Sequence, residues 1–155
     1  MPIEVRPASI LSDEATVLIE ALNAELSAVY PEPGATHFRL DPNEVAPGRG
    51  AFFLARLDGE PVGCGAVRLL GDGQDAEIKR MYTAPTARGR GVARAILAAI
   101  EAEARRLGAQ RLVLETGTRQ GAALALYRRE GFVDIAAFGE YTASPGTSVC
   151  MARPL

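Results

Sequence analysis

The stretch APTARGRGVARAILAAIEAEARRLG, residues 84–108, decides the fold. Its longer part, residues 92–107, predicts a helix because apolar side chains recur on one face at helical spacing. These are Val92, Ile96, Ile100 and Leu107. Gly108 follows at the position where helices commonly end in a left-handed residue. A glycine-containing turn, residues 88–91, therefore leads directly into the best helix of the chain.

This turn is a candidate anion site. Gly89 and Gly91 let backbone N–H groups approach a ligand, and the helix that follows presents unpaired amides and the positive end of its dipole. A pyrophosphate would suit such a turn, whereas the alternative is a tight turn with two solvated arginines, Arg88 and Arg90. A dinucleotide fingerprint fits poorly because Arg94 stands at its third glycine position. A P-loop is also disfavoured because G-K-[ST] is absent.

Outward from this segment, strands and helices alternate along the chain. Alternating or apolar runs predict strands at 3–8, 51–57, 61–70, 76–83, 111–115, 132–138 and 148–154. Asp58-Gly59-Glu60 predicts a hairpin between two of them. Helices are expected after Ser12 and over 122–130, in addition to 92–107. This order predicts a single α/β sandwich domain over residues 1–155, with a mixed, mostly antiparallel sheet and helices on both faces.

Residues 30–50 contain too many prolines and glycines for one continuous element. A long irregular segment is expected there, and such segments often form part of a binding site. It contains His37, the one histidine of the chain, and Arg39. An isolated surface histidine is the simpler interpretation of His37, although contact of either residue with a substrate stays open.

Composition narrows the classes of function. The chain has 155 residues, 17 Lys and Arg against 19 Asp and Glu, and 48% hydrophobic residues. A net charge of −2 disfavours nucleic acid as a partner. No signal peptide or long apolar run is found, so we expect a cytoplasmic protein without a membrane partner. Cys64 and Cys150 form no metal-binding pattern, and we expect two small buried residues and no metal.

Two sequence motifs, at the expected separation from each other, resemble those of one known family. RGRGVA at 88–93 matches the Q/R-x-x-G-x-G/A signature of the GNAT superfamily of acetyl-CoA-dependent N-acetyltransferases. LETGTRQGAALALYRREGF at 114–132 is similar to the later strand and helix of that family. EIKRMY, LETGTRQ and FGEY look most like a subgroup of small bacterial members whose acceptors are largely unsettled. The element order agrees with the family over nearly the whole chain.

The resemblance implies how acetyl-CoA, the expected co-substrate, would be held. Backbone groups of Met81, Tyr82 and Thr83 would pair with the pantetheine arm. The amides of Arg88, Gly89, Arg90, Gly91, Val92 and Ala93 would hold the pyrophosphate. Gln120 stands where many relatives have Asn, and this departure puts a side-chain contact with the pantetheine arm in question.

The resemblance also implies catalytic residues. Tyr127 falls on the tyrosine that protonates the departing thiolate, and Glu115 falls where some members carry a general base. Other members place the base on the preceding strand, where Glu77 is available. The chemistry itself needs such groups, since an amine attacks a thioester only when neutral and the leaving sulfur benefits from a proton donor. Glu115 could instead be a solvated or paired strand-end residue, Glu77 could point to solvent, and Tyr127 could be a core-edge aromatic.

The function expected from these residues is transfer of acetyl from acetyl-CoA to a primary amine, by direct attack in a ternary complex. A small-molecule amine is the first choice and a protein N-terminus the second. A module that binds acyl-CoA without catalysis is the rival class. The sequence does not decide the oligomeric state, and a homodimer is the assembly that we keep open.

Overall fold

The computed structural model describes residues 2–31, 40–144 and 146–155. The elements are β1 (Ile3–Pro7), α1 (Asp13–Val29), η1 (Pro42–Val45), β2 (Gly50–Leu57), β3 (Glu60–Leu70), β4 (Asp75–Thr83), η2 (Pro85–Ala87), α2 (Val92–Arg106), β5 (Arg111–Gly117), α3 (Gly121–Arg129), β6 (Val133–Ile135), η3 (Gly139–Ala143) and β7 (Ser148–Pro154), where η marks a 3₁₀ helix. Apart from the three 3₁₀ helices, the strands and α-helices follow in the predicted order. The prediction of a strand over 132–138 is too long, because β6 pairs with β7 only as far as Ile135. The chain then turns away toward η3.

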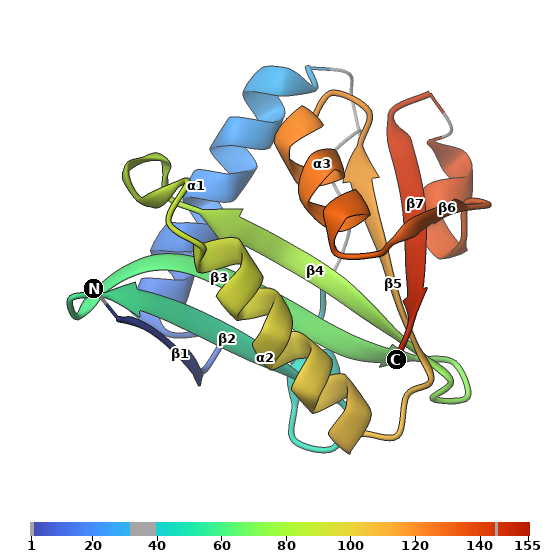
Figure 1. Ribbon diagram of the computed structural model, residues 1–155, viewed down its shortest axis with the longest axis horizontal. Helices are drawn as coiled ribbons and strands as arrows, with labels where there is room; N and C mark the ends of the chain where they lie inside the picture. The colour runs from blue at the N-terminus through green and yellow to red at the C-terminus, as the bar shows by residue number, and fades with distance from the viewer. Residues whose placement is uncertain (1, 32–39, 145) are drawn as a thin grey trace.

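In the described part of the chain, one sheet contains all seven strands, in the order β1-β2-β3-β4-β5-β7-β6 (Figure 1). Every neighbouring pair is antiparallel except β4 and β5, which are parallel. The predicted mixed, mostly antiparallel sheet is thus confirmed. The single parallel contact requires a crossover, and α2 supplies it.

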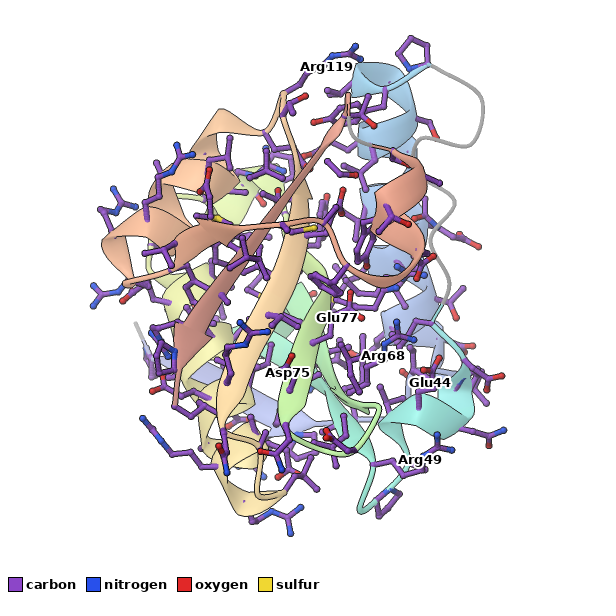
Figure 2. The ribbon with its side chains drawn as sticks, turned by 90° about the vertical axis from the view of Figure 1, so that its right-hand side faces the viewer. Glu44, Arg49, Arg68, Asp75, Glu77 and Arg119 are labelled. Carbon is purple, nitrogen blue, oxygen red and sulfur yellow. The ribbon has the colours of Figure 1, made fainter. Side chains whose placement is uncertain are left out.

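Helices cover both faces of the sheet, as predicted. Helices α2 and α3 lie on one face, while α1 and η3 lie on the other (Figures 1 and 2). The periodic stripe read from the sequence is the buried face of α2: Ile96 and Ile100 are both fully buried in the larger core cluster. Burial of each such side chain stabilises the folded state by about 1.5–3 kcal/mol. Leu18 and Leu22 of α1 form the second cluster with strand residues of the opposite face.

The feature that positions the site is the separation of β4 from β5. Their pairing covers only Asp75–Ile78 against Arg111–Leu114, although β4 continues to Thr83 and β5 to Gly117. A β-bulge follows in β4, where Arg80 and Met81 stand opposite the single residue Gly65 of β3. Arg80 has φ of +58°, an uncommon value for a residue with a side chain. Because a bulge bends its strand, β4 turns away from β5 and the sheet opens at its centre (Figure 1).

Candidate active site

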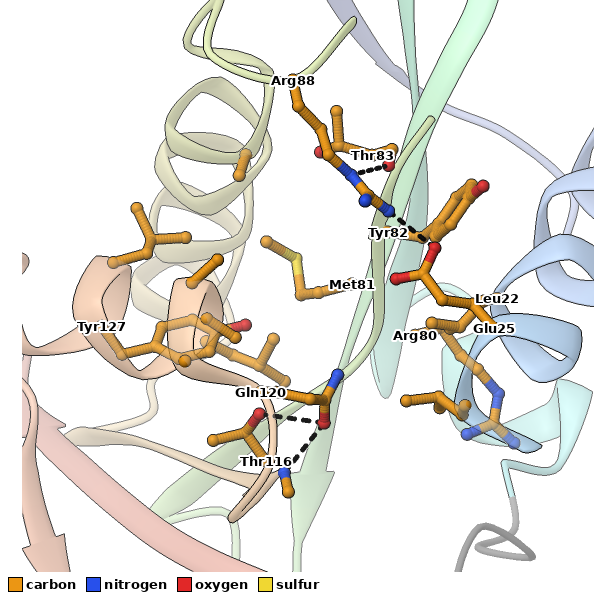
Figure 3. Close-up of a pocket in the computed structure, with 18 of the residues that line it drawn as sticks. Leu22, Glu25, Arg80, Met81, Tyr82, Thr83, Arg88, Thr116, Gln120 and Tyr127 are labelled. Carbon is orange, nitrogen blue, oxygen red and sulfur yellow. Dashed lines mark hydrogen bonds and ion pairs between the residues drawn. The ribbon is translucent and has the colours of Figure 1, made fainter. Parts of the chain in front are cut away.

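A cleft of about 820 Å³ lies where β4 and β5 separate. Its walls come from β4 from Ile78 onward, the end of β5, the last turns of α1, the first turn of α2, and one side of α3. Figure 3 shows this arrangement, with Met81 of β4 between Tyr127 on one side and α1 on the other. Met81, Tyr82 and Thr83, the predicted backbone contacts, all line the cleft. The cleft therefore exposes a strand edge that a ligand can reach.

The turn before α2 forms one end of the cleft. Gly89 and Gly91 have φ of +79° and +84°, so both positions require the conformational freedom of glycine. The first helical hydrogen bond runs from the Ala95 N–H to the Gly91 carbonyl, which leaves the preceding amides without helical partners. Of the six residues predicted at 88–93, all but Arg90 line the cleft. The geometry is that of an anion site at a helix N-terminus.

The side chain of Arg88 is already engaged by the protein. Its Nε donates to the Thr83 carbonyl at 3.0 Å, and its guanidinium forms an ion pair of 2.7 Å with Glu25 of α1 (Figure 3). The turn is thereby tied both to the end of β4 and to α1. An anion bound at this turn would be held by the backbone amides and the helix dipole without displacing these contacts of Arg88.

Of the two carboxylates predicted as bases, only Glu115 lines the cleft. Burial raises its pKa above the ordinary value, and the Ser148 hydroxyl opposes this shift. Among the described residues, no cation forms an ion pair with it. Partial desolvation beside a cleft favours uptake of a proton by a carboxylate, as a proton acceptor requires.

Glu77 has a different environment. The interpretation in which it points to solvent is wrong, because its side chain is fully buried. One carboxylate oxygen accepts from Arg68 Nε at 2.9 Å, and the other accepts from the Tyr141 hydroxyl at 2.5 Å. Both oxygens are therefore occupied by protein groups.

Tyr127 projects from α3 into the cleft, and Figure 3 shows its hydroxyl directed toward β4. Its ring packs edge-on against Phe132, with centroids 5.5 Å apart. Burial raises the pKa of the phenol, so it keeps its proton at neutral pH. The described residues provide no hydrogen-bond partner for its hydroxyl. Tyr127 is thus both packed in the core, as one interpretation had it, and open to the cleft at its polar end.

Gln120 holds the turn between β5 and α3. Its side-chain carbonyl accepts from the Gly117 N–H at 2.9 Å and from the Thr116 hydroxyl at 3.3 Å. The amide nitrogen points away from that turn, toward β4 (Figure 3). The predicted contact with a pantetheine arm stays a prediction, and the position of the nitrogen is compatible with it.

Sequence reasoning did not identify several residues that shape the cleft. Tyr30, at the end of α1, accepts a hydrogen bond of 2.7 Å from the Arg119 N–H, and the Arg119 guanidinium donates to the Val29 carbonyl. Tyr141 of η3 and Lys79 of β4 also line the cleft. Only the alternation of β4 could have placed Lys79 beside Glu77; no local pattern indicates the others. His37 and Arg39 lie outside the described residues.

Other sequence predictions concern metals, membranes and thiols. Over residues 2–31, 40–144 and 146–155, no group of three potential metal ligands is found, and no helix there is long and apolar enough to cross a membrane. Cys64 and Cys150 are buried, as predicted. Burial raises the pKa of the Cys64 thiol to about 12, and neither cysteine lines the cleft.

Comparison with known proteins agrees with this geometry. The "IAA acetyltransferase" of Azospirillum brasilense is 41% identical over 145 residues, which are 94% of this chain and 93% of that protein. A Klebsiella pneumoniae structure described as an acyl-CoA N-acyltransferase has a TM-score of 0.82 at 34% identity, covering 99% and 97% of the two chains. A GNAT family acetyltransferase from Elizabethkingia anophelis, solved with acetyl-CoA bound, shares the fold with a TM-score of 0.70 at 18% identity, covering 99% and 98%. The model of the acetyltransferase (GNAT) family matches residues 16–132. The resemblance seen in the sequence is confirmed: this chain belongs to the GNAT family of acetyltransferases.

Proposed function

We propose that the protein transfers the acetyl group of acetyl-CoA to the primary amine of a small molecule, by direct attack in a ternary complex. The observation that carries the proposal is one cleft that brings together Glu115, the hydroxyl of Tyr127 and the amides before α2. These groups correspond to the three needs of the reaction: a proton acceptor, a proton donor and a place for phosphate.

The cleft suits acetyl-CoA in size and in chemistry. Its volume of about 820 Å³ is in the range of ligand pockets. The exposed edge of β4 over Met81–Thr83 offers backbone groups to the amides of a pantetheine arm, while the turn at 88–93 would receive the pyrophosphate. Bound in this way, acetyl-CoA supplies a thioester between β4 and β5.

Glu115 is our choice for the proton acceptor. It stands just beyond Leu114, the last residue of β5 that pairs with β4, where these two strands have begun to separate. The amine nitrogen forms a bond to the thioester carbonyl carbon, and the proton that it loses goes to the Glu115 carboxylate, directly or through water. Glu77 is a poorer choice because Arg68 and Tyr141 occupy its oxygens.

Tyr127 is our choice for the proton donor. When the carbon–sulfur bond breaks, the sulfur takes the electron pair and the Tyr127 hydroxyl supplies the proton. The products are an N-acetyl amine and the free thiol of CoA. A phenol with a raised pKa is fully protonated before the reaction, which is the state that a donor needs.

Direct attack is supported by the state of the cysteines. An acyl-enzyme route through cysteine needs a thiolate within reach of the thioester. Cys64 is fully buried in the core beside α1, and its thiol donates a hydrogen bond to the Arg80 carbonyl at 3.2 Å. Cys150 is also buried, and its pKa is raised by burial. Neither thiol is suited to carry the acetyl group.

The small-molecule acceptor is supported by contacts that join the end of α1 to the opposite side of the cleft. Tyr30 and Arg119 join the end of this helix to the turn between β5 and α3. The guanidinium also lies over the Tyr30 ring, 5.1 Å from its centroid. This bridge and Tyr141 line the same cleft as Glu115, and on this ground we favour a small amine over a protein chain.

A panel of amines tests the proposal. Free amino acids, biogenic amines, amino sugars and a tripeptide with a free N-terminus are each mixed with acetyl-CoA, and release of the CoA thiol is measured. At least one small amine should give turnover that depends on Tyr127. Turnover with the tripeptide alone would favour the N-terminal acetyltransferase. Tight binding of acetyl-CoA without turnover for any amine would favour the non-catalytic module.

A further inference from the structure

The acceptor side of the cleft is bounded by η3, a segment attached to the sheet through side chains. Residues 136–147 connect β6 to β7, and the strand pairing of the described sheet includes none of them. Figure 2 shows η3 on the same face of the sheet as α1. The position of this wall therefore depends on what Glu140 and Tyr141 contact.

Tyr141 provides the first attachment. Its side chain is buried, and its hydroxyl donates to Glu77 Oε2 at 2.5 Å. Phe138 packs edge-on against its ring, with centroids 5.2 Å apart. A charge-assisted hydrogen bond of this length, excluded from water, is among the stronger single contacts available to a short segment.

Glu140 provides the second attachment. Its carboxylate forms an ion pair of 3.3 Å with Lys79, whose side chain is almost fully buried. Glu77 and Lys79 are two residues apart on β4, so both project from the same face of the strand. Consecutive residues of η3 are thus held by two neighbouring residues of β4, just before the bulge at Arg80.

Arg68 of β3 also contacts Glu77. It is the register partner of Glu77 on β3 and donates to Glu77 Oε1 through Nε at 2.9 Å, with a second nitrogen at 2.8 Å. The same guanidinium pairs with Glu44 of η1. Arg68 thereby compensates the buried charge of Glu77 and leaves its other oxygen for Tyr141.

We propose that Glu77 is a positioning residue: through Tyr141 it fixes the η3 wall opposite α1, so that an acceptor amine is held against Glu115. The Glu77 carboxylate itself takes no proton from the amine. The kinetic part of this inference rests on the proposed function. Its structural part, the attachment of η3 to β4, can be tested without any activity. Glu77 and Glu115 then share one face of the sheet but have separate tasks, anchoring the wall and accepting the proton.

Hydrogen exchange tests the structural part without an acceptor. The amides of Tyr141 and Ser144 donate within this segment, to Phe138 and Tyr141 carbonyls respectively. In Tyr141→Phe, which keeps the ring and removes the bond to Glu77, exchange over 138–147 should speed up by about tenfold or more while α2 is unchanged. Glu77→Gln should have the same effect, and Glu115→Gln, the matched control, should not. Unchanged exchange in Tyr141→Phe would overturn the proposal even if Glu77→Gln fails to fold.

Kinetics tests the functional part, with the panel amine of highest kcat/KM as the probe. Tyr141→Phe and Glu77→Gln should raise the KM for this amine about tenfold and keep the ascending limb of the pH profile, with unchanged affinity for acetyl-CoA by calorimetry. Loss of that limb in Glu77→Gln would overturn the proposal and make Glu77 the base. If no panel amine reacts, the proposed function fails, and the exchange result still decides how η3 is held.

Discussion

We expect a glycine at position 91, at the start of α2, for two reasons: the left-handed backbone and the closeness to the proposed pyrophosphate. Two substitutions at this position separate them. The residue has φ of +84°, and a Cβ built there meets nothing within 4 Å, so Gly91→Ala adds backbone strain without a clash. A left-handed alanine costs about 1–2 kcal/mol. For a chain of this length that lowers Tm by roughly 2–8 °C. In Gly91→Glu the same strain is joined by a carboxylate beside the proposed pyrophosphate. At about 8 Å and an effective dielectric constant of about 20, repulsion by one phosphate charge is about 2 kcal/mol, or about 30-fold in affinity.

Gly108 is the matched control. It follows the other end of α2, has φ of +86°, and its Cβ also meets nothing within 4 Å. Gly108→Ala and Gly108→Glu should therefore lower Tm as the Gly91 variants do and leave acetyl-CoA binding unchanged. Calorimetry at low salt should show Gly91→Glu binding about 30-fold more weakly than Gly91→Ala, with a smaller gap in high salt because the repulsion is screened. Equal affinity of the two Gly91 variants at low salt would refute the placement of the pyrophosphate.

Three further expectations concern catalysis and the cleft wall. Tyr127→Phe should lower kcat by roughly 10²–10⁴-fold with little change in acetyl-CoA affinity, and wild-type turnover where chemistry limits the rate would remove Tyr127 from the mechanism. Because burial raises the pKa of Glu115 and the base is its deprotonated form, the rate should rise with pH along a limb above the ordinary carboxyl range. Glu115→Gln should abolish that limb while Glu77→Gln keeps it, and the reverse pattern in pH–rate profiles would exchange the two roles. Gly117→Ala places a Cβ 1.8 Å from the Tyr30 hydroxyl, so it should displace Tyr30 and lower stability by about 1–3 kcal/mol. The same change on a Tyr30→Ala background should cost much less in thermal unfolding, and an equal cost in both backgrounds would argue against the Tyr30 contact.

The elements could be predicted because local patterns specify them. The apolar stripe of α2 is its buried face, and Asp58-Gly59 forms the hairpin between β2 and β3, with Asp58 itself at φ of +53°. Only a few sheet topologies are compatible with this order of strands and helices. At 132–138 the sequence pattern is weak, and the predicted strand is too long. The extent of pairing with β7 is not determined by the residues of this segment alone.

The site could be predicted only in part. The motifs pointed to the turn at 88–93, Glu115 and Tyr127, and all of these residues except Arg90 line one cleft, while their binding and catalytic roles stay predictions. The burial of Glu77 could not be predicted, because its partner Tyr141 is 64 residues away in sequence and belongs to a segment without periodicity. The bulge at Arg80 depends on how β3 and β4 pair, a relation between two strands that neither strand encodes alone.

The separation of β4 from β5 also bears on self-association. Unpaired strand edges normally recruit strands from other molecules, and the inner edges of β4 beyond Ile78 and of β5 beyond Leu114 have no strand partner in the described part of the chain. Here these edges lie inside the sheet, with α1 and η3 on one face and α2 and α3 on the other. Charged Lys79 and Arg80 and the bulge itself make the β4 edge a poor template for a foreign strand. Peptide groups at the centre of the sheet can thus stay without a strand partner while the helices on both faces limit the access of foreign strands.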